Sequence, residues 1–274
     1  MKAYLQTYSL GRALRDDFEG SLKKLAEMGY AGVEFAGFYG DKTAAELKAF
    51  LDEIGLEAVS GHVGLDLVES SVPYLKEIGA KYVICPMARF NTMEECEKIA
   101  AEFNRVGKIA KDAGLQFGYH NHTQEFAQID GKYLLDIVME LTDPDLVKLQ
   151  LDVGWATCAG IDVPAYIEKY NGRMCMIHVK ETDRVIGVQK PVDFSKFPKD
   201  DDGKPILPQS FIDEMKAIAA TDCPTGKGII DWANIKAVAD KAGATHYIIE
   251  REWDYKGDDI FGCVKEDLEA VKDI

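Results

Sequence analysis

The chain has little positive charge, and this lack excludes several kinds of partner. Its 274 residues carry 32 Lys and Arg against 47 Asp and Glu, which gives a formal net charge of −15 at pH 7. Binding to DNA, to RNA or to an anionic membrane surface depends on clustered basic residues. We therefore expect no nucleic-acid partner and no membrane partner. A small anionic substrate is not excluded, because a few local cations can hold it.

Long apolar runs and paired cysteines are also missing. No apolar stretch approaches the ~20 residues that a membrane span requires. The N-terminal segment Met1–Thr7 is too short and too polar for a signal peptide, and it is predicted to be a first strand. The six cysteines are scattered and form no C-x-x-C pair, which fits a reducing compartment. We therefore expect a cytoplasmic protein.

One short pattern recurs along the chain: the end of a helix, a glycine, and then an apolar strand. A helix commonly ends with a left-handed residue, a conformation that glycine adopts without steric cost. Repetition of this joint indicates a repeated βα unit and hence a parallel sheet. The five glycines of the pattern are Gly29, Gly55, Gly79, Gly114 and Gly243.

The apolar runs predict eight strands with amphipathic helices between them. Eight βα units in about 250 residues are typical of a (β/α)8 TIM barrel. A doubly wound open sheet is the alternative, but that fold usually has a glycine-rich phosphate-binding motif after its first strand. No such motif surrounds Ser9–Arg12. We predict one α/β TIM-barrel domain over residues 1–274, with strands near residues 2–7, 31–35, 56–62, 81–86, 115–121, 147–152, 174–180 and 245–250.

One connection is much longer than the others. Residues 182–210, after the seventh strand, hold four of the nine prolines and the charged run Lys199–Lys204. Such a loop is usually a functional lid or a solvated insertion. Because the seventh strand leads directly into it, we expect a lid at the rim of the active site, with a solvated insertion as the alternative.

Titratable side chains stand where the predicted strands end. In a TIM barrel those ends share one rim, which is where such barrels carry out chemistry. Carboxylates and imidazoles without cysteine suit a divalent cation, and an unpaired carboxylate in a barrel mouth is costly without one. A plain turn or a surface charge run is the alternative for each carboxylate. The strand-end residues are His62, His120, His122, Asp152, His178 and Glu250.

The segment Gly118–Phe126, with the sequence GYHNHTQEF, resembles a motif of the sugar phosphate isomerase/epimerase family of xylose isomerase-like TIM barrels. That family includes inosose dehydratases and, more distantly, endonuclease IV. The similarity covers nearly the whole chain and implies a xylose isomerase-like barrel. The other matching segments are Gly32–Phe35, Ser60–His62, Leu151–Trp155, Ile177–Glu181, Gly226–Trp232 and Ile249–Trp253.

The resemblance implies one divalent metal ion held by residues after strands five to eight. Three of its four ligands carry over to Asp152, His178 and Glu250. Many relatives end strand five with Glu-Asn-His, where this chain has His120–His122. Either His120 takes the fourth position or Glu125 reaches back to it. We expect Glu125, because a second carboxylate balances the charge of the ion better than a neutral imidazole. Mn²⁺ is the expected ion, with Mg²⁺, Co²⁺ and Zn²⁺ as alternatives.

Several further residues are expected to contact the substrate. The faces of the tryptophans suit a sugar ring, with core packing as the alternative. Lys180 could stabilise a developing oxyanion or pair with Glu181 or Asp152. His120 and His122, two residues apart on an extended strand, are expected to face the barrel mouth together, with Asn121 facing the helices. The alternative is that His122 caps the next turn. The residues expected to bind substrate are Glu34, His62, Trp155, Lys180 and Trp253.

The implied chemistry is abstraction of a proton next to the keto group of a carbohydrate, with the cation as Lewis acid. We expect a metal-dependent isomerase or epimerase. A lyase or dehydratase acting on inososes or 3-keto-glycosides is the alternative, which the His-Asn-His sequence favours. A DNA repair enzyme like endonuclease IV would need a basic DNA-binding face and a metal cluster. Assembly into a homo-oligomer stays open. The expected catalytic residues are Glu125, Glu250, His120 and His122.

Overall fold

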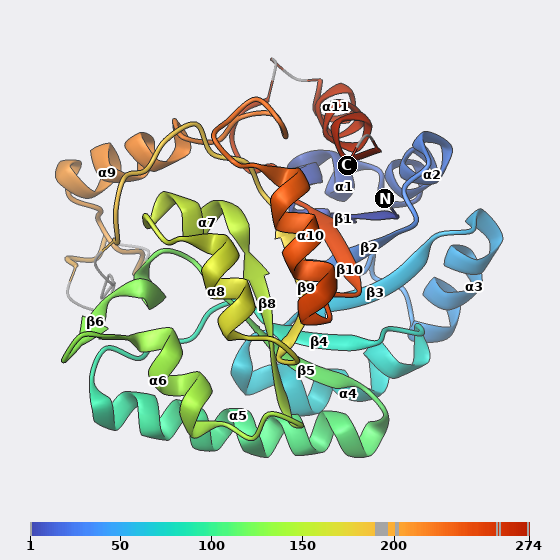
Figure 1. The fold of residues 1–274 in the computed structure, drawn as a ribbon. Helices are drawn as coiled ribbons and strands as arrows, with labels where there is room; N and C mark the ends of the chain where they lie inside the picture. Colours follow the sequence, from blue (N-terminus) through green and yellow to red (C-terminus); the bar gives the residue numbers. More distant parts are fainter. Residues whose placement is uncertain (1, 190–196, 201–202, 256, 258, 273) are drawn as a thin grey trace.

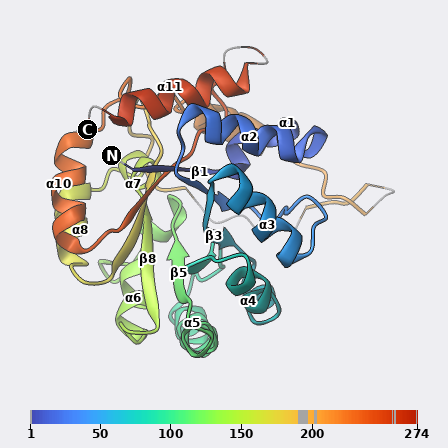
Figure 2. The same ribbon diagram turned by 90° about the vertical axis from the view of Figure 1, so that its right-hand side faces the viewer.

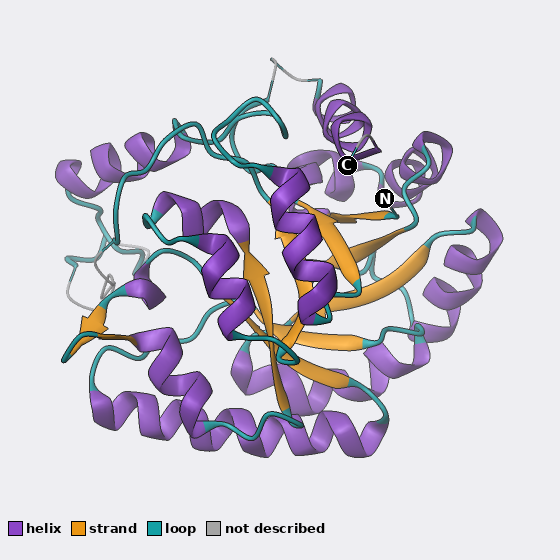
Figure 3. Ribbon diagram, viewed as in Figure 1, coloured by secondary structure: helices purple, strands orange, loops and turns teal. Residues whose placement is uncertain are grey.

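The computed structural model describes residues 2–189, 197–200, 203–255, 257, 259–272 and 274. Parallel strands close into a barrel, in which each barrel strand lies beside the next one in the chain (Figure 1, Figure 3). The predicted TIM barrel is therefore confirmed. Its strands are β1 (Ala3–Gln6), β2 (Gly32–Phe35), β3 (Glu57–His62), β4 (Tyr82–Cys85), β5 (Gln116–His120), β8 (Val147–Asp152), β9 (Met174–Val179) and β10 (His246–Ile249).

Helices surround the strands, as the turned view shows (Figure 2). A short hairpin of β6 (Gln128–Ile129) and β7 (Lys132–Tyr133) and three 3₁₀ turns, η1 (Thr7–Leu10), η2 (Leu65–Leu67) and η3 (Gln124–Phe126), complete the described elements. The helices are α1 (Gly11–Asp16), α2 (Phe18–Met28), α3 (Ala44–Ile54), α4 (Val68–Glu77), α5 (Met93–Ala113), α6 (Leu134–Leu141), α7 (Val153–Cys158), α8 (Val163–Lys169), α9 (Gln209–Ala219), α10 (Trp232–Ala242) and α11 (Ile260–Lys272).

The glycines of the repeated joint have the conformation that the pattern predicts. Gly29, Gly55, Gly79, Gly114 and Gly243 all have positive φ angles, between 71° and 97°. A side chain would be strained there. Each glycine therefore ends one helix and allows the chain to turn into the next strand.

Side chains of the strands alternate between the outside and the inside of the barrel. Leu149, Leu151, Ile177 and Val179 are fully buried and belong to the large core between the strands and the helices. A smaller apolar cluster includes Met176, which precedes His178 by two residues on β9. This alternation places polar residues inside the barrel without interrupting the outer core.

The long connection after β9 has little regular structure where it is described. Isolated bridges join Thr182 to Asp222 and Lys199 to Pro205, and α9 begins at Gln209. Residues 190–196 and 201–202 of the predicted 182–210 insertion lie outside the described residues. Among the described residues, no helix combines the length and the apolar character that a bilayer span requires.

A buried ion pair joins the end of β10 to α11. The Arg251 guanidinium donates through Nε to Asp267 Oδ2 at 2.8 Å, and both side chains are 1% exposed. Asp267 also accepts the backbone N–H of Thr225, and the Arg251 backbone N–H donates to Ser9 Oγ. The pair therefore ties α11, the segment before α10 and η1 to the rim next to Glu250.

Replacing Asp267 by alanine is expected to destabilise the fold strongly. The Asp267→Ala variant leaves a buried guanidinium without its carboxylate, which costs about 3–5 kcal/mol of unfolding free energy. Denaturant unfolding measures the change. The control Asp112→Ala removes the exposed ion pair with Lys108 and should change stability far less. Similar small losses in both variants would contradict this role of the buried pair.

Candidate active site

The polar half of the barrel interior lies at the carboxyl ends of the strands. The apolar cluster beneath it contains Tyr4, Val59, Ile84, Cys175, Met176 and Ile248. The residues above this cluster come from different strands and are all buried, so they can contact one another only because the barrel closes. They are Gln6, Glu34, Ser60, His120, Gln150 and His178.

Glu34, at the third position of β2, is the centre of this layer and is fully buried. Its Oε1 accepts hydrogen bonds from Gln6 Nε2 at 2.9 Å and from His178 Nε2 at 2.7 Å. Its Oε2 accepts from Ser60 Oγ at 2.6 Å and from Gln150 Nε2 at 2.7 Å. Because every one of these groups donates, they favour an ionised Glu34.

Charge in this layer is balanced between carboxylates and imidazoles. Burial alone would raise the pKa of Glu34, but the His62 and His178 imidazoles hold that pKa well below its usual value. Burial would lower the pKa of His178, but Glu34 and Glu250 raise it to about 10. His178 is fully buried between these two carboxylates, with Nδ1 3.0 Å from Glu250 Oε2. The protonated, positively charged form of His178 is therefore favoured between the two carboxylates.

Gln150 connects Glu34 to His120 and His62 through hydrogen bonds. Its amide nitrogen donates to Glu34, so its Oε1 faces the other way and accepts from His120 Nδ1 at 3.1 Å and from His62 Nε2 at 2.9 Å. With Nδ1–H of His120 used in this way, Nε2 of that ring keeps its lone pair. His178 is held differently: Nε2 faces Glu34 and Nδ1 faces Glu250 Oε2 at 3.0 Å, so each ring nitrogen donates to a carboxylate.

Four residues offer ligand atoms for one cation. One potential ligand atom from each lies within 4.8 Å of the others, and all four residues are buried. Asp152 Oδ2 has no hydrogen-bond partner although Asp152 is fully buried, and burial raises the pKa of this carboxyl to about 7. A nitrogen and oxygen ligand set with an unpartnered carboxylate oxygen fits a divalent ion. The four residues are His120, Asp152, His178 and Glu250.

A second group of possible ligands consists of His62, His120 and His178. It shares two members with the first group, so these two groups of described residues do not offer independent sites. The geometry therefore differs from the cluster that the endonuclease IV hypothesis requires.

The structure does not bring Glu125 to the cation group. Glu125 lies in η3, where its Oε1 accepts from the Tyr119 hydroxyl at 2.8 Å and its Oε2 accepts the His122 backbone N–H at 2.8 Å. The chain turns directly after β5, so the Glu125 carboxylate binds the turn itself. His120, the last residue of β5, is the strand-five residue that joins Asp152, His178 and Glu250.

His122 faces the cavity although β5 ends at His120. Its ring lies 5.1 Å from that of His120 and 5.7 Å from that of Trp155, and its Nδ1 has no hydrogen-bond partner. Burial lowers the pKa of His122 to about 4. The expectation that Asn121 faces the helices was wrong. Its side chain bonds to the backbone of Asp152 at the end of β8.

A cavity of about 720 Å³ opens above the cation group. It is lined by rim residues that the sequence singles out, and α9 and the 86–91 segment form its outer walls. Gln189, from the long connection, also lines it and bonds to Thr123 after β5. The predicted site residues along its wall are His62, His120, His122, Glu125, Trp155, Glu250 and Trp253.

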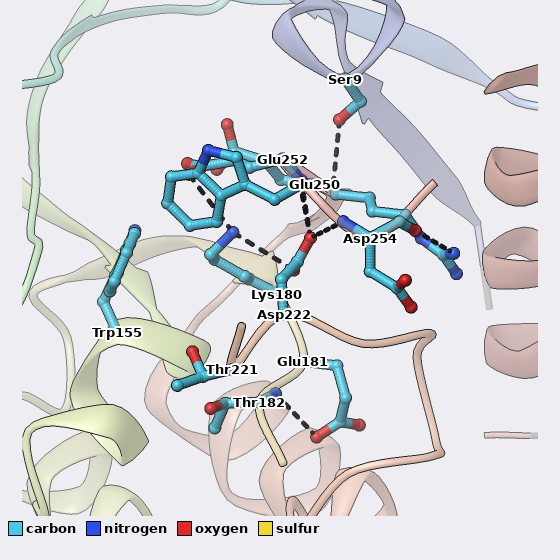
Figure 4. A network of polar contacts seen from close by, with 12 residues as sticks. Ser9, Trp155, Lys180, Glu181, Thr182, Thr221, Asp222, Glu250, Glu252 and Asp254 are labelled. Atoms are coloured by element: carbon cyan, nitrogen blue, oxygen red, sulfur yellow. Dashed lines mark hydrogen bonds and ion pairs between the residues drawn. The ribbon is translucent and has the colours of Figure 1, made fainter. Parts of the chain in front are cut away.

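Lys180 lies beneath two of these wall residues instead of lining the cavity. Its buried Nζ is 5.1 Å from the centroid of the Trp155 ring and 4.8 Å from that of Trp253. Asp222 Oδ1 and Glu252 Oε2 lie 3.5 and 3.6 Å from Nζ (Figure 4). Burial alone would lower the pKa of Lys180, but these two carboxylates raise it. The ammonium therefore supports both indoles by cation–π contacts.

Asp222 fixes the rim after β10. Its Oδ2 accepts three successive backbone N–H groups, those of Glu252, Trp253 and Asp254, at 2.8–3.1 Å. Asp222 follows α9 in the chain, so this contact connects the α9 segment to the rim. Glu252 itself lines the cavity, and burial raises its pKa to about 8.

Five polar residues of the site were not predicted from the sequence. Three of them carry a usable signal, because each stands two residues from a strand-end residue or ends a strand itself. Asp222 has no such signal, since it reaches the rim from a loop, and Glu252 resembles an ordinary surface charge. The five are Gln6, Ser60, Gln150, Asp222 and Glu252.

Known proteins share this architecture. The inosose dehydratase of Geobacillus kaustophilus (strain HTA426) is 26% identical over 189 residues, which are 58% of this chain and 60% of that protein. The match thus spans less than two thirds of the relative. A sugar phosphate isomerase/epimerase structure from Parabacteroides distasonis ATCC 8503 is 24% identical, with a TM-score of 0.79 and coverage of 99% of this chain and 93% of that one.

A structure of the IOLI protein with a bound zinc atom is 13% identical, with a TM-score of 0.71, and the alignment covers 100% of this chain and 97% of that one. A family model described as xylose isomerase-like TIM barrel matches residues 22–274. The resemblance seen in the sequence is thereby confirmed, and the chain belongs to the xylose isomerase-like TIM barrel family.

Proposed function

We propose that this chain is a divalent-metal-dependent enzyme that removes the proton next to a keto group of a carbohydrate or keto-cyclitol. The observation that carries the proposal is the fully buried Asp152 Oδ2, which accepts no hydrogen bond, within the group of His120, His178 and Glu250. A carboxylate oxygen is costly to bury without a partner, and a cation in this group would supply one.

A divalent ion at this position supplies Lewis-acid stabilisation of negative charge on adjacent substrate oxygens. The side chains around this position orient the two imidazoles. Gln150 and Glu34 orient them through hydrogen bonds to one ring nitrogen of each. His178 Nδ1, which lies 3.0 Å from Glu250 Oε2, would give up its proton when a cation binds there. Mn²⁺ suits a set of two imidazoles and two carboxylates, and Zn²⁺, which the IOLI structure binds, is the alternative.

His122 and Glu250 are the proposed proton-transfer residues, because both line the cavity beside the cation group. His122 is the stronger candidate for exchange with the substrate, since its Nδ1 has no partner within the protein. The Glu125 carboxylate accepts hydrogen bonds from the Tyr119 hydroxyl and the His122 backbone N–H. We therefore assign Glu125 a positioning role instead of the ligand role expected from the sequence.

The products distinguish two related activities. Return of the proton to carbon gives an isomerase or epimerase, and departure of a neighbouring hydroxyl gives a dehydratase. The match to inosose dehydratases favours the second, and both begin with the same step. No disulfide joins the cysteines of the described residues, which supports a reducing, cytoplasmic location.

The choice between His120 and Glu125 as ligand can be tested by metal affinity. His120→Ala is expected to weaken Mn²⁺ binding by about 100-fold or more, because a ligand costs at least as much as an outer contact. Glu125→Gln should retain affinity within a few-fold. Calorimetric titration of the metal-free proteins measures both. Loss of affinity in Glu125→Gln with retention in His120→Ala would restore the expectation drawn from the sequence.

Deuterium exchange tests the shared first step. The Mn²⁺-loaded protein, incubated with an inosose or a ketose in D₂O, should introduce deuterium next to the keto group, as followed by NMR. His122→Asn should slow this exchange by about 10²–10⁴-fold with metal affinity retained. His246→Asn, a control near the amino ends of the strands, should exchange at the normal rate. If the protein introduces deuterium into none of the ketones, the proposed proton abstraction is contradicted. If His122→Asn exchanges at the normal rate, the role of His122 is contradicted.

A further inference from the structure

His122 and Glu252 occupy matching positions on two strands of the barrel. Each follows a residue of the cation group by two positions: His122 follows His120 at the end of β5. Glu252 follows Glu250 after β10 in the same way. Side chains two residues apart along a strand point to the same side, and all four residues line the cavity. The proposed chemistry uses His122 and gives no role to Glu252.

The residues in between agree with this alternation. Arg251 points away from the cavity, since its guanidinium pairs with Asp267 of α11. Asn121 bonds to the backbone of Asp152. Alternation therefore directs Glu252 into the cavity although β10 itself ends at Ile249.

His122 and Glu252 lie at opposite ends of the cation group. The strands that carry this group are neighbours in the barrel, in the order β5, β8, β9 and β10. His122 follows the first of these strands, and Glu252 follows the last. The ring centroid of Trp155 is 5.7 Å from that of His122 and 5.7 Å from that of Trp253. A substrate ring bound against the indoles would therefore have His122 at one end and Glu252 at the other.

The Glu252 carboxyl has acceptor capacity that the protein does not use. Within the described part of the chain, the only hydrogen bond or ion pair of this side chain is the ion pair with Lys180, whose Nζ lies 3.6 Å from Oε2 (Figure 4). That distance is longer than a hydrogen bond. The side chain is only 11% exposed, and a carboxyl oxygen so far withdrawn from water is costly unless a donor reaches it. A substrate hydroxyl is such a donor.

Contacts within the protein hold Glu252 in this position. Its backbone N–H donates to Asp222 Oδ2 at 3.1 Å. Lys180 has a second carboxylate beside it, because Asp222 Oδ1 lies 3.5 Å from Nζ. Lys180 therefore does not depend on Glu252 alone for a counter-charge, and the Glu252 carboxyl is available to a ligand.

We propose that Glu252 is a further substrate-contacting residue, which accepts a hydroxyl that the cation does not hold, at the end of the ring away from His122. The proposal rests on the proposed function for the position of the cation and of the keto group. It does not depend on the charge of the carboxyl, since both forms keep an oxygen that accepts a hydrogen bond. With the ring held at both ends, Glu252 determines which carbon next to the keto group faces His122.

Two ligands without a keto group test this contact in the absence of turnover. Both scyllo-inositol and trans-1,2-cyclohexanediol offer adjacent hydroxyls to a cation, but only the inositol has further hydroxyls. Calorimetry on the Mn²⁺-loaded protein gives the ratio of their affinities. In Glu252→Ala the preference for the inositol should fall by about tenfold or more, while the affinity for the diol stays within about twofold. An unchanged preference would overturn the proposal.

Glu214→Ala is the matched control, because Glu214 also lines the cavity, from α9, and is exposed. It should preserve the preference for the inositol. An equal fall in both variants would assign the effect to the general charge of the cavity and overturn the contact with Glu252. Glu252→Leu keeps the bulk of the side chain if the alanine variant fails to fold. It should lower the preference to the same extent, and a preserved preference in this variant would also overturn the proposal.

Failure of this inference can be distinguished from failure of the proposed function. Deuterium exchange into a ketone, together with an unchanged preference in Glu252→Ala, would retain the function and reject the contact. A preference that depends on Glu252, without exchange in any ketone, would retain the contact and reject the chemistry.

Discussion

A fully buried carboxylate, Glu34, is the constraint on which the polar half of the barrel depends. An ionised carboxylate away from water is costly unless donors surround it, and here four strands supply them: Gln6, Ser60, Gln150 and His178. Meeting this requirement also sets the orientation of the donors. Through Gln150, Nε2 of His120 keeps its lone pair, and Nδ1 of His178 is directed at Glu250 next to Asp152.

The fold satisfies this requirement through closure and alternation. Only a closed barrel brings residues of β1, β2, β3, β8 and β9 to one point, and alternation along each strand keeps the outer core apolar while the inner layer changes from Met176 to His178. The rim is fixed separately. Asp222 accepts three backbone N–H groups after β10, and Lys180 lies against the two indoles, so this part of the cavity wall is held by contacts within the protein.

Features with a local cause could be predicted from the sequence. Strand runs and helix-ending glycines follow from short-range chemistry, and Asp152, His178 and Glu250 were identified because strand ends share a rim. The placement of Glu125 could not be predicted from charge balance, because it depends on how the chain turns after His120. Gln150 is an uncharged residue whose importance comes only from Glu34, and Asp222 reaches the rim through a loop with no periodic pattern. Such contacts are set by tertiary packing.

Anomalous diffraction from crystals soaked in Mn²⁺ tests whether the barrel mouth holds one cation. We predict one peak inside the barrel mouth, in contact with His120, His178 and the carboxylates of Asp152 and Glu250. Gln150 and Glu34 should still be bonded to the far sides of the two imidazoles. A peak bound by Glu125 instead of His120, or no peak in the barrel mouth, would contradict this prediction.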